Sequence, residues 1–297
     1  MKILILGSKG FIGNNLLDYF RKKKHIVYGS DIFSDELDEK YIQFSSVSSN
    51  FDSLFKSFCF DLCINCSGAS NVLNSFNKHE LDFQLNSINV FNILNSIKTY
   101  NSNCKFINLT SAAVYGNPTI LPVRESDQIN PISPYGFHKL ISEIILSEYY
   151  KIYDIQTCSL RLFSVYGIGL NKQILWDIFQ KWKSDENIEF HGSGNETRDF
   201  IYIDDLIKVI EIIIENGDFK GEVINVANGE EIKIKDIVKL MLDELGIRDF
   251  NFNNVIRTGD PLRWKADISK IKSMGYLKSI NIEDGIKKYV IWLKDLK

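Results

Sequence analysis

Short apolar runs alternate with helical patterns along the first 110 residues of the chain. Four runs predict buried strands, at residues 2–6, 25–30, 61–66 and 105–109. Helical spacing of apolar side chains follows the first run over residues 11–24, and longer helical stretches cover about 75–100 and 134–151. Strands that alternate with helices are typical of a parallel sheet covered on both faces. The pattern therefore predicts an α/β fold with a doubly wound parallel sheet of the Rossmann type.

The second half of the chain has shorter mixed elements and turn signals such as Gly192-Ser193-Gly194 and Gly259-Asp260-Pro261. A length of 297 residues permits two domains, and no repeat or long linker separates the halves. We therefore predict two interleaved, closely packed domains. The first covers residues 1–164 with a returning segment at about 196–227, and the smaller C-terminal domain covers residues 165–297.

Composition excludes several classes of function. The net charge of −3 gives no basic field for nucleic acid. The five cysteines include one CxxC, Cys63-Ile64-Asn65-Cys66, without the second ligand pair that a zinc site needs. No run approaches the roughly 18 apolar residues of a membrane helix, and nothing resembles an export signal. We expect free thiols, no metal, and a cytoplasmic protein with no membrane or nucleic-acid partner.

Gly7, Gly10 and Gly13 form a GxxGxxG run between the first predicted strand and the first predicted helix. Such a run permits a tight turn, lets a pyrophosphate approach the backbone and allows strand and helix to pack closely. Asp31 ends the second predicted strand, where a carboxylate can accept hydrogen bonds from both ribose hydroxyls of NAD. Residues 32–36 supply no Arg or Lys for a 2′-phosphate, so we predict NAD(H) rather than NADP(H).

Tyr135 and Lys139 lie four residues apart in a predicted helix that begins at Ser133-Pro134, so they project from one face. Ser111 lies 24 residues before Tyr135, directly after a predicted strand, where a Rossmann-type sheet presents its ligands. The spacing alone is weak evidence for a catalytic pair, because Tyr19 and Lys23 have the same spacing.

The chemistry needs this arrangement because a phenol, with a pKa of about 10, is too weakly acidic to act as a base at neutral pH. A nearby ammonium and a cationic nicotinamide favour the phenolate. We predict that Tyr135 is the general acid–base, that Lys139 also holds the nicotinamide ribose, and that Ser111 hydrogen-bonds the reacting oxygen. His138 is a rival base in principle, but a lone histidine on the neighbouring face is more typical of the surface.

These residues together resemble the extended short-chain dehydrogenase/reductase family, in its NAD-dependent epimerase/dehydratase branch. Five further segments are similar to motifs of that branch. They are residues 86–94 (NVxGTxNLL), 110–116 (SSxxVYG), 161–167 (RxxNVYG), 192–205 (GxGxxxRDFxYVDD), and 257–261 with 266–270 (R-x-GD and AD-x-SK). The last four are more specific to enzymes that modify nucleotide-diphosphate sugars.

The resemblance implies a wider set of site residues. Further cofactor contacts would come from Phe11, Ile12, Ile32, Ser67, Gly68 and Asn86, and from the catalytic residues Tyr135 and Lys139. Substrate contacts would come from Ser111, Ala112, Ser164, Arg198 and Arg257. The two arginines would contact the diphosphate, which suits the paired fork of a guanidinium. The resemblance also implies a homodimer through the helices that hold Asn86 and Tyr135.

The chain departs from the family pattern at three places. Ser164 stands where Asn is usual, and Asn65-Cys66-Ser67-Gly68 stands where H-x-A-A/G is usual. Ser46-Val47 replaces an Asp-hydrophobic pair near the adenine. None of these changes removes a predicted catalytic group.

The residues after Ser111 bear on the reaction. Ala112 and Ala113 stand where the 4,6-dehydratases of the branch carry Asp-Glu, and two alanines cannot act as acid and base. Two reactions remain, a single NADH-dependent reduction of a 4-keto-6-deoxy-sugar nucleotide and a 4-epimerisation with bound NAD⁺. The C-terminal portion is short for an epimerase, which favours the reductase. A non-catalytic dinucleotide sensor would typically lack the Tyr–Lys pair, and an alcohol dehydrogenase for apolar substrates would not need the two arginines.

Overall fold

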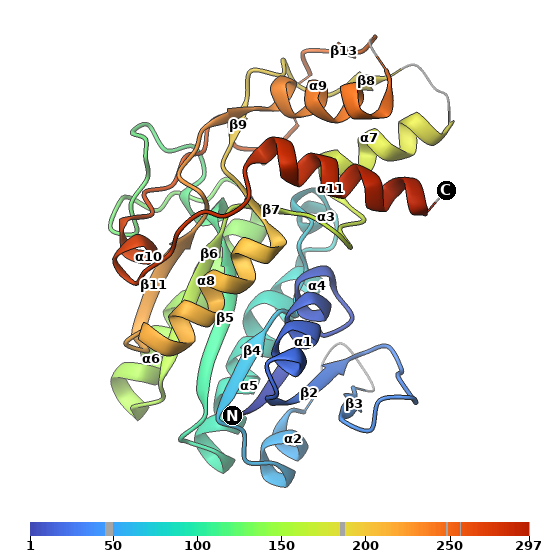
Figure 1. Cartoon of the computed structure of the whole chain (residues 1–297). Coiled ribbons are helices and arrows are strands. Elements are labelled where there is room, and N and C mark those ends of the chain that lie inside the picture. Colours follow the sequence, from blue (N-terminus) through green and yellow to red (C-terminus); the bar gives the residue numbers. More distant parts are fainter. Residues whose placement is uncertain (45–49, 185–187, 248, 256, 297) are drawn as a thin grey trace. The chain divides into compact units, whose positions relative to one another are not determined.

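The computed structural model describes residues 1–44, 50–184, 188–247, 249–255 and 257–296 (Figure 1). The chain divides into two compact units that exchange segments. Unit 1 comprises Met1–Gly116, Gln128–Leu162 and Ile214–Asn225. Unit 2 comprises Asn117–Asp127, Phe163–Ile213 and Val226–Lys297. Each unit is considered by itself.

Unit 1 is built on a seven-stranded sheet with the strand order β11-β6-β5-β4-β1-β2-β3. Its strands are β1 (Lys2–Leu6), β2 (Ile26–Asp31), β3 (Tyr41–Gln43), β4 (Leu62–Asn65), β5 (Lys105–Ser111), β6 (Thr157–Leu162) and β11 (Lys220–Val226). Neighbours from β3 to β6 pair in parallel. The chain passes from β1 outward to β3 and then returns to β4 on the other side of β1. In open sheets of this kind ligands bind at such a reversal, outside the carboxyl ends of the strands.

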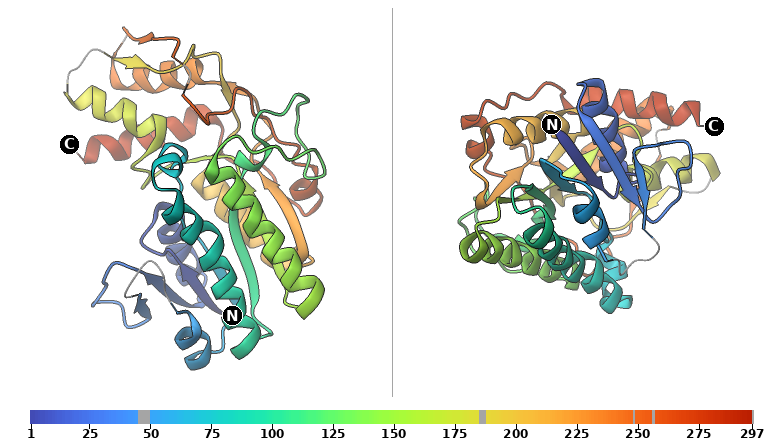
Figure 2. Two further views of the ribbon diagram at one scale, coloured as in Figure 1. Left: turned by 180° about the vertical axis from the view of Figure 1, so that it is seen from behind. Right: turned by 90° about the horizontal axis from the view of Figure 1, so that it is seen from below.

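The helices of unit 1 cover both faces of this sheet. They are α1 (Phe11–Lys22), α2 (Asp52–Ser57), α3 (Val72–Asn77), α4 (His79–Phe83), a π-helical turn (Gln84–Ile88), α5 (Asn89–Tyr100), a 3-10 turn (Ala112–Tyr115) and α6 (Pro134–Tyr153). Figure 2 shows α5 and α6 side by side on one face. The predicted α/β architecture with a parallel Rossmann-type sheet is confirmed.

Local chemistry explains where these elements begin and what they bury. Residues 3–6 of β1 are fully buried, as expected of a strand covered on both faces. The side chain of Ser133 caps α6 by accepting a hydrogen bond from the Gly136 N–H at 3.1 Å, and Pro134 occupies the first turn. Apolar residues of α5, including Ile93 and Leu94, pack into the core between this helix and the sheet.

Unit 2 consists of helices around short strand pairs. Its helices are α7 (Gln173–Ser184), α8 (Ile203–Asn216), which ends in unit 1, α9 (Ile234–Leu245), α10 (Ser269–Ser273) and α11 (Ile282–Asp295). Its strands pair as β7 (Ser164–Tyr166) with β10 (Phe200–Tyr202), β8 (Glu189–Phe190) with β13 (Asn251–Phe252), and β9 (Thr197–Arg198) with β12 (Ile232–Lys233). Within the described residues, no helix combines the length and apolarity that a membrane crossing requires.

Candidate active site

The loop between β1 and α1 has the close backbone packing that its glycines predict. Gly7 turns the chain with φ at +75°, and a Cβ on Gly13 would lie 2.1 Å from the Gly7 carbonyl oxygen. Gly10 is the N-cap of α1, and no side chain caps the helix, which begins with Phe11 and Ile12. The uncapped backbone N–H groups and the helix dipole can therefore receive a phosphate. This loop fits the dinucleotide pyrophosphate that the sequence predicts.

Asp31 lies beside this loop at the carboxyl end of β2. Its Oδ2 accepts a hydrogen bond from the Lys9 N–H at 3.0 Å, and its Oδ1 accepts one from the Ile32 N–H at 2.7 Å. The side chain of Ile32 is 44% exposed. Asp31 is thus fixed against the phosphate loop. A carboxylate at this position can accept hydrogen bonds from a ribose beside the pyrophosphate.

The segment that follows β4 also reaches the phosphate loop. A Cβ on Gly7 would lie 2.7 Å from the Ser67 backbone nitrogen. Gly68 has φ at +123°, and its Cβ would lie 2.6 Å from Asn86 Oδ1 and 3.6 Å from Lys139 Nζ. The structure thus brings five of the predicted residues together, from four parts of the sequence.

Ser111, Tyr135 and Lys139 meet where β5 ends. Ser111 Oγ accepts a hydrogen bond from the Ala113 N–H at 3.1 Å, and the Tyr135 hydroxyl shares a hydrogen bond with Ser111. Lys139 Nζ donates to the Leu109 carbonyl oxygen at 2.9 Å and lies 5.8 Å from the Tyr135 ring centroid. The predicted serine, tyrosine and lysine therefore form one cluster.

Burial controls the charge state of the tyrosine in this cluster. Desolvation, with a smaller contribution from the negative charge of Asp82, raises the pKa of Tyr135 to about 12, while the hydrogen bond with Ser111 opposes the rise. Tyr135 is therefore a neutral phenol at physiological pH in the protein alone. It can serve as a base only when added positive charge stabilises the phenolate, as a cationic nicotinamide would.

His138 corrects the sequence interpretation, which placed it on the surface. Its side chain is 4% exposed, and its Nδ1 lies 2.6 Å from Asp82 Oδ1. Ser87 Oγ donates to the His138 carbonyl oxygen at 3.0 Å. Helix α4 packs against α6 and covers the imidazole, an arrangement that a pattern on α6 alone does not reveal. His138 thus fixes α6 beside the cluster and is not available as a rival base in this arrangement.

Asn86 occupies an unusual place among the predicted cofactor contacts. It lies in the π-helical turn before α5 and is 1% exposed. Neither its Nδ2 nor its Oδ1 has a hydrogen-bond partner among the described residues. A buried amide without partners is costly, and π-helical turns often occur at functional sites. The orphaned amide beside Gly68 and Lys139 fits a polar group supplied by a bound cofactor.

Two buried networks behind the cluster were missed by sequence reasoning. In the first, Asn65 Nδ2 donates to Asn108 Oδ1 at 2.9 Å, and Asn108 Nδ2 donates to Ser142 Oγ at 3.2 Å. Ser142 Oγ in turn donates to the Lys139 carbonyl oxygen at 2.7 Å, and Asn65 Oδ1 accepts from the Ser67 hydroxyl at 2.5 Å. The network joins the segment after β4 to the helix of Lys139. Its only signal in the sequence is a polar residue within an otherwise apolar run, Asn65 in the predicted strand 61–66 and Asn108 in the predicted strand 105–109.

The second network is an ion pair in the core of unit 1. Arg161, 2% exposed, donates from Nη2 to Glu143 Oε2 at 2.7 Å and from Nη1 to the Tyr115 hydroxyl at 2.8 Å. Thr110 Oγ1 donates to Glu143 Oε1 at 2.9 Å. Glu143 lies one turn after Lys139 on α6, and Thr110 precedes Ser111 on β5. The network therefore ties the helix and the strand that carry the cluster to each other.

The predicted substrate arginines lie in unit 2. Arg198 on β9 donates from Nη1 to the Thr197 carbonyl oxygen at 2.8 Å, and its guanidinium lies 5.4 Å from the Trp264 ring centroid. Burial lowers the pKa of Arg198, against the opposing charges of Asp260 and Glu196. Asp260 interacts electrostatically with both Arg198 and the exposed Arg257. Arg198 and Arg257 thus both interact with the carboxylate of Asp260. A diphosphate could take the place of this carboxylate as their anionic partner.

The remaining positions singled out in the sequence are Ser164, Ala112 and the Ser46-Val47 pair. Ser164, half-buried, begins β7 and pairs with Phe200 of β10. Ala112 is fully buried in the 3-10 turn that Ser111 begins. Ser46-Val47 lies outside the described residues.

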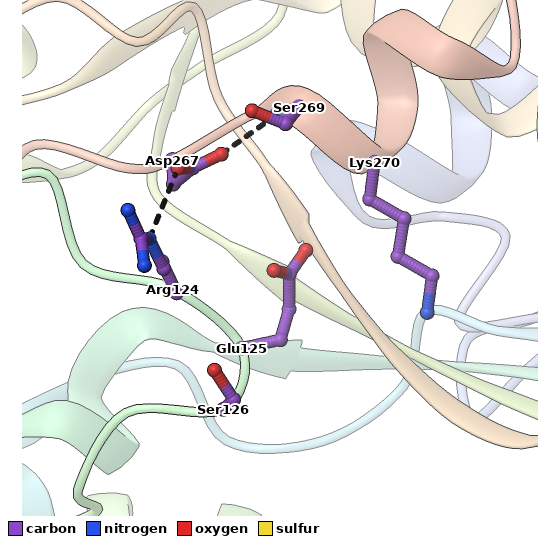
Figure 3. Close-up of a pocket in the computed structure, with 6 residues that line it drawn as sticks. All are labelled: Arg124, Glu125, Ser126, Asp267, Ser269 and Lys270. Atoms are coloured by element: carbon purple, nitrogen blue, oxygen red, sulfur yellow. Dashed lines mark hydrogen bonds and ion pairs between the residues drawn. The ribbon is translucent and has the colours of Figure 1, made fainter.

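A polar hollow in unit 2, of about 340 Å³, contains none of the predicted site residues (Figure 3). Its lining consists of Arg124, Glu125, Ser126, Asp267, Ser269 and Lys270. Asp267 is paired there, with the Arg124 guanidinium at 3.5 Å and the Ser269 N–H at 2.8 Å. Among the described residues, no three histidine, cysteine or acidic side chains gather as a metal site requires.

Comparison with known proteins decides the family. The model of the NAD dependent epimerase/dehydratase family matches residues 3–227, which is more than half of the chain. The chain belongs to this family. The resemblance inferred from the motifs is thereby confirmed, and with it an NAD-dependent enzyme of the short-chain dehydrogenase/reductase type.

Relatives match this enzyme over nearly its whole length. A UDP-glucuronate 4-epimerase of Thermodesulfobacterium geofontis is 26% identical, over 98% of this chain and 96% of its own length. A dTDP-D-glucose 4,6-dehydratase of Dictyostelium discoideum is 28% identical, over 99% of this chain and 82% of its own. The crystal structure of a Bacillus cereus UDP-glucuronic acid 4-epimerase, in complex with UDP-glucuronic acid and NAD, superposes with a TM-score of 0.90, 26% identity and full coverage of both chains.

Proposed function

We propose that this enzyme is an NAD-dependent 4-epimerase of a UDP-sugar. The observation that carries the proposal is the cluster of Ser111, Tyr135 and Lys139 at the carboxyl end of β5, beside the orphaned amide of Asn86. These groups can exchange a proton with a hydroxyl while the phosphate loop and Asp31 hold a dinucleotide. The role assigned to each residue is part of the proposal.

Bound NAD would supply the hydride chemistry, accepting the hydride of C4 and returning it. The protein would handle the proton. The Tyr135 phenolic oxygen removes the proton of the C4 hydroxyl and gives it back after the sugar has presented its other face. Ser111 Oγ hydrogen-bonds the same sugar oxygen and keeps it against the phenol. Lys139 favours the phenolate by its charge and holds the nicotinamide ribose.

The substrate would be held by the arginines of unit 2. Arg198 and Arg257 share the carboxylate of Asp260, and a diphosphate offers both guanidinium groups a stronger, doubly charged partner. The flat face of Trp264 supports the Arg198 guanidinium from one side. We therefore assign cofactor binding to unit 1 and diphosphate binding to unit 2. The choice of UDP follows the 4-epimerases similar to this chain.

A sugar-nucleotide reductase, the reaction favoured by the sequence alone, has less support. That preference came from the short C-terminal portion, yet the T. geofontis 4-epimerase is matched over 96% of its own length. The B. cereus 4-epimerase is matched over all of its structure. A chain of this length is therefore long enough for epimerisation. The dehydratase reaction remains disfavoured because Ala112 and Ala113 offer no acid or base.

A homodimer through α5 and α6 is part of the same proposal. Phe137 and Ile144 of α6 are 51% and 59% exposed, and their spacing of seven residues places them on one helix face. Phe91 of α5, the neighbouring helix, is 43% exposed. Covering this apolar surface with a second copy would stabilise the pair. Light scattering coupled to gel filtration should give a dimer for the wild type and a monomer for Phe137→Glu.

The proposed reaction is tested with purified protein and no added cofactor. UDP-glucose, UDP-glucuronic acid and UDP-N-acetylglucosamine are each incubated separately, and the products are resolved by chromatography and proton NMR. We expect one of them to reach equilibrium with its C4 epimer, without net change in NADH absorbance. The reductase would be established instead by two results together. No epimer forms, even with NAD⁺ added, and the enzyme oxidises NADH when a 4-keto-6-deoxy-sugar nucleotide is supplied.

A further inference from the structure

The phosphate loop carries a cation of its own, outside the segment 32–36 that follows Asp31. Lys9 lies between Gly7 and Gly10, and its ammonium forms an ion pair with the carboxylate of Asp35. The two side chains are 32% and 23% exposed, so the pair is partly shielded from water. The ammonium also lies 5.1 Å from the Tyr41 ring centroid.

This ion pair lies next to the proposed ribose contact. The Lys9 backbone N–H donates to Asp31 Oδ2 at 3.0 Å, so one residue touches the ribose-binding carboxylate through its backbone and Asp35 through its side chain. With the neighbouring pair of Arg21 and Asp38, the surroundings hold two cations and three carboxylates. A phosphate on the ribose would therefore meet a net negative charge, although a lysine stands within the loop.

We propose that Asp35 is a specificity-determining residue that excludes NADP(H) by pairing with Lys9. The inference rests on the proposed dinucleotide site. Asp31 alone repels a 2′-phosphate, but the free ammonium of Lys9 would offset that repulsion with a charge-assisted hydrogen bond. Asp35 removes this compensation because it pairs with the ammonium. Preference for NAD(H) in this chain thus depends on two carboxylates, one at the end of β2 and one four residues later.

The test measures dissociation constants for NADH and NADPH by fluorescence titration of the wild type, Asp35→Asn and Asp38→Asn. Asp38 is a matched control because it forms the other ion pair of this segment, with Arg21 at 2.6 Å, at similar exposure. We expect Asp35→Asn to tighten NADPH binding about tenfold, the value of one charge-assisted hydrogen bond, and to leave NADH within about twofold. Asp38→Asn should leave the ratio of the two constants unchanged.

A double variant identifies the group responsible. Lys9→Met combined with Asp35→Asn should lose the gain in NADPH affinity, because no ammonium is left to receive the phosphate. The proposal is wrong if Asp35→Asn leaves the ratio unchanged, if Asp38→Asn shifts it equally, or if the double variant keeps the gain. A wild type that binds neither dinucleotide would instead refute the proposed function, so the two failures are distinguishable. Thermal unfolding of each variant confirms that it is folded.

Discussion

The candidate site residues of the two units differ in how firmly they are held. In unit 1, Tyr135 and Lys139 are 8% and 6% exposed, and hydrogen bonds join each of them to β5. In unit 2, Arg257 is exposed and Arg198 is half-buried, and both interact with the single carboxylate of Asp260. The first set is fixed by buried hydrogen-bond partners. The second shares an ionic partner that a ligand phosphate could replace, although Arg198 also donates to the Thr197 carbonyl oxygen.

The difference matches the tasks that we propose for the two units. Proton transfer requires reacting atoms at a fixed separation, so rigid support behind Tyr135 is useful. Phosphate binding requires cations that can leave one anionic partner for another, and Asp260 supplies a partner of that kind. The comparison predicts that substitutions in the Ser111, Tyr135 and Lys139 cluster and its buried networks change turnover or folding, whereas substitutions of the unit 2 arginines change substrate affinity.

Replacing Tyr135 with Phe should have the largest effect. Loss of the phenolic oxygen should lower kcat about a thousandfold, within the range for general acid–base catalysis, because no other group can take the proton. NADH affinity should stay within about twofold, since the ring remains. Steady-state kinetics and NADH titration measure the two quantities.

Tyr19→Phe is the matched control for this variant. Tyr19 and Lys23 repeat the spacing of Tyr135 and Lys139, with Lys23 Nζ 5.3 Å from the Tyr19 ring centroid. Full activity is expected because Tyr19 lies in the second half of α1 and Lys23 follows its last residue, at the opposite end of the helix from the phosphate loop. Activity retained by Tyr135→Phe would remove the phenol from the proposed mechanism.

Breaking the buried ion pair should destabilise unit 1 strongly. Glu143→Gln leaves the Arg161 charge buried without its carboxylate, which should lower the free energy of unfolding by about 3 kcal/mol. Glu148→Gln, at an exposed position on the same helix, should cost less than about 0.5 kcal/mol. Urea unfolding followed by circular dichroism compares them. Equal midpoints for the two variants would show that the network does not support the fold.

The sequence predicts the elements of unit 1 wherever apolar and polar side chains follow a clear pattern along the chain. β1 was predicted with its observed bounds because residues 3–6 are all apolar and all buried. β11 gives no such pattern, since it begins with Lys220, Gly221 and Glu222 before its buried residues. The helical stretch predicted at about 75–100 is divided into the end of α3, the short helix α4, a π-helical turn and the longer helix α5, because local hydrogen bonding and not periodicity sets those breaks.

The candidate site was predictable only in part. Motif residues such as Ser111 and Tyr135 could be found because their types and spacing are set by the chemistry. The partners Asp82 and Asn108 could not, because each contacts α6 from a distant part of the chain. Lys9 was overlooked for the same reason, since its partner Asp35 lies 26 residues away in sequence.

Replacing Arg198 with Ala should weaken substrate binding without abolishing the chemistry. Loss of one guanidinium from a diphosphate should raise the dissociation constant of UDP about thirtyfold, or about 2 kcal/mol. Arg263→Ala is a matched control, since Arg263 is an exposed arginine of unit 2 paired with Glu231 at 2.7 Å. Isothermal titration calorimetry should show no more than a twofold change for it. An equal loss in both variants would indicate a general charge effect and not a diphosphate site.

Replacing Asp31 should have the smallest effect on ligand binding. When the ribose binds, the Asp31 carboxylate gives up hydrogen bonds with water and gains hydrogen bonds with the ribose hydroxyls, so the net gain in free energy is small. Asp31→Ala should raise the dissociation constant of NADH about tenfold. The variant also frees the N–H groups of Lys9 and Ile32, but both can turn to water at the open edge of the loop. ADP-ribose and 2′-deoxy-ADP-ribose, titrated against both proteins, separate the two causes. The wild type should bind ADP-ribose more tightly than 2′-deoxy-ADP-ribose, whereas the variant should bind the two equally. If both proteins show the same difference in dissociation constant, Asp31 only stabilises the phosphate loop and does not contact the ribose.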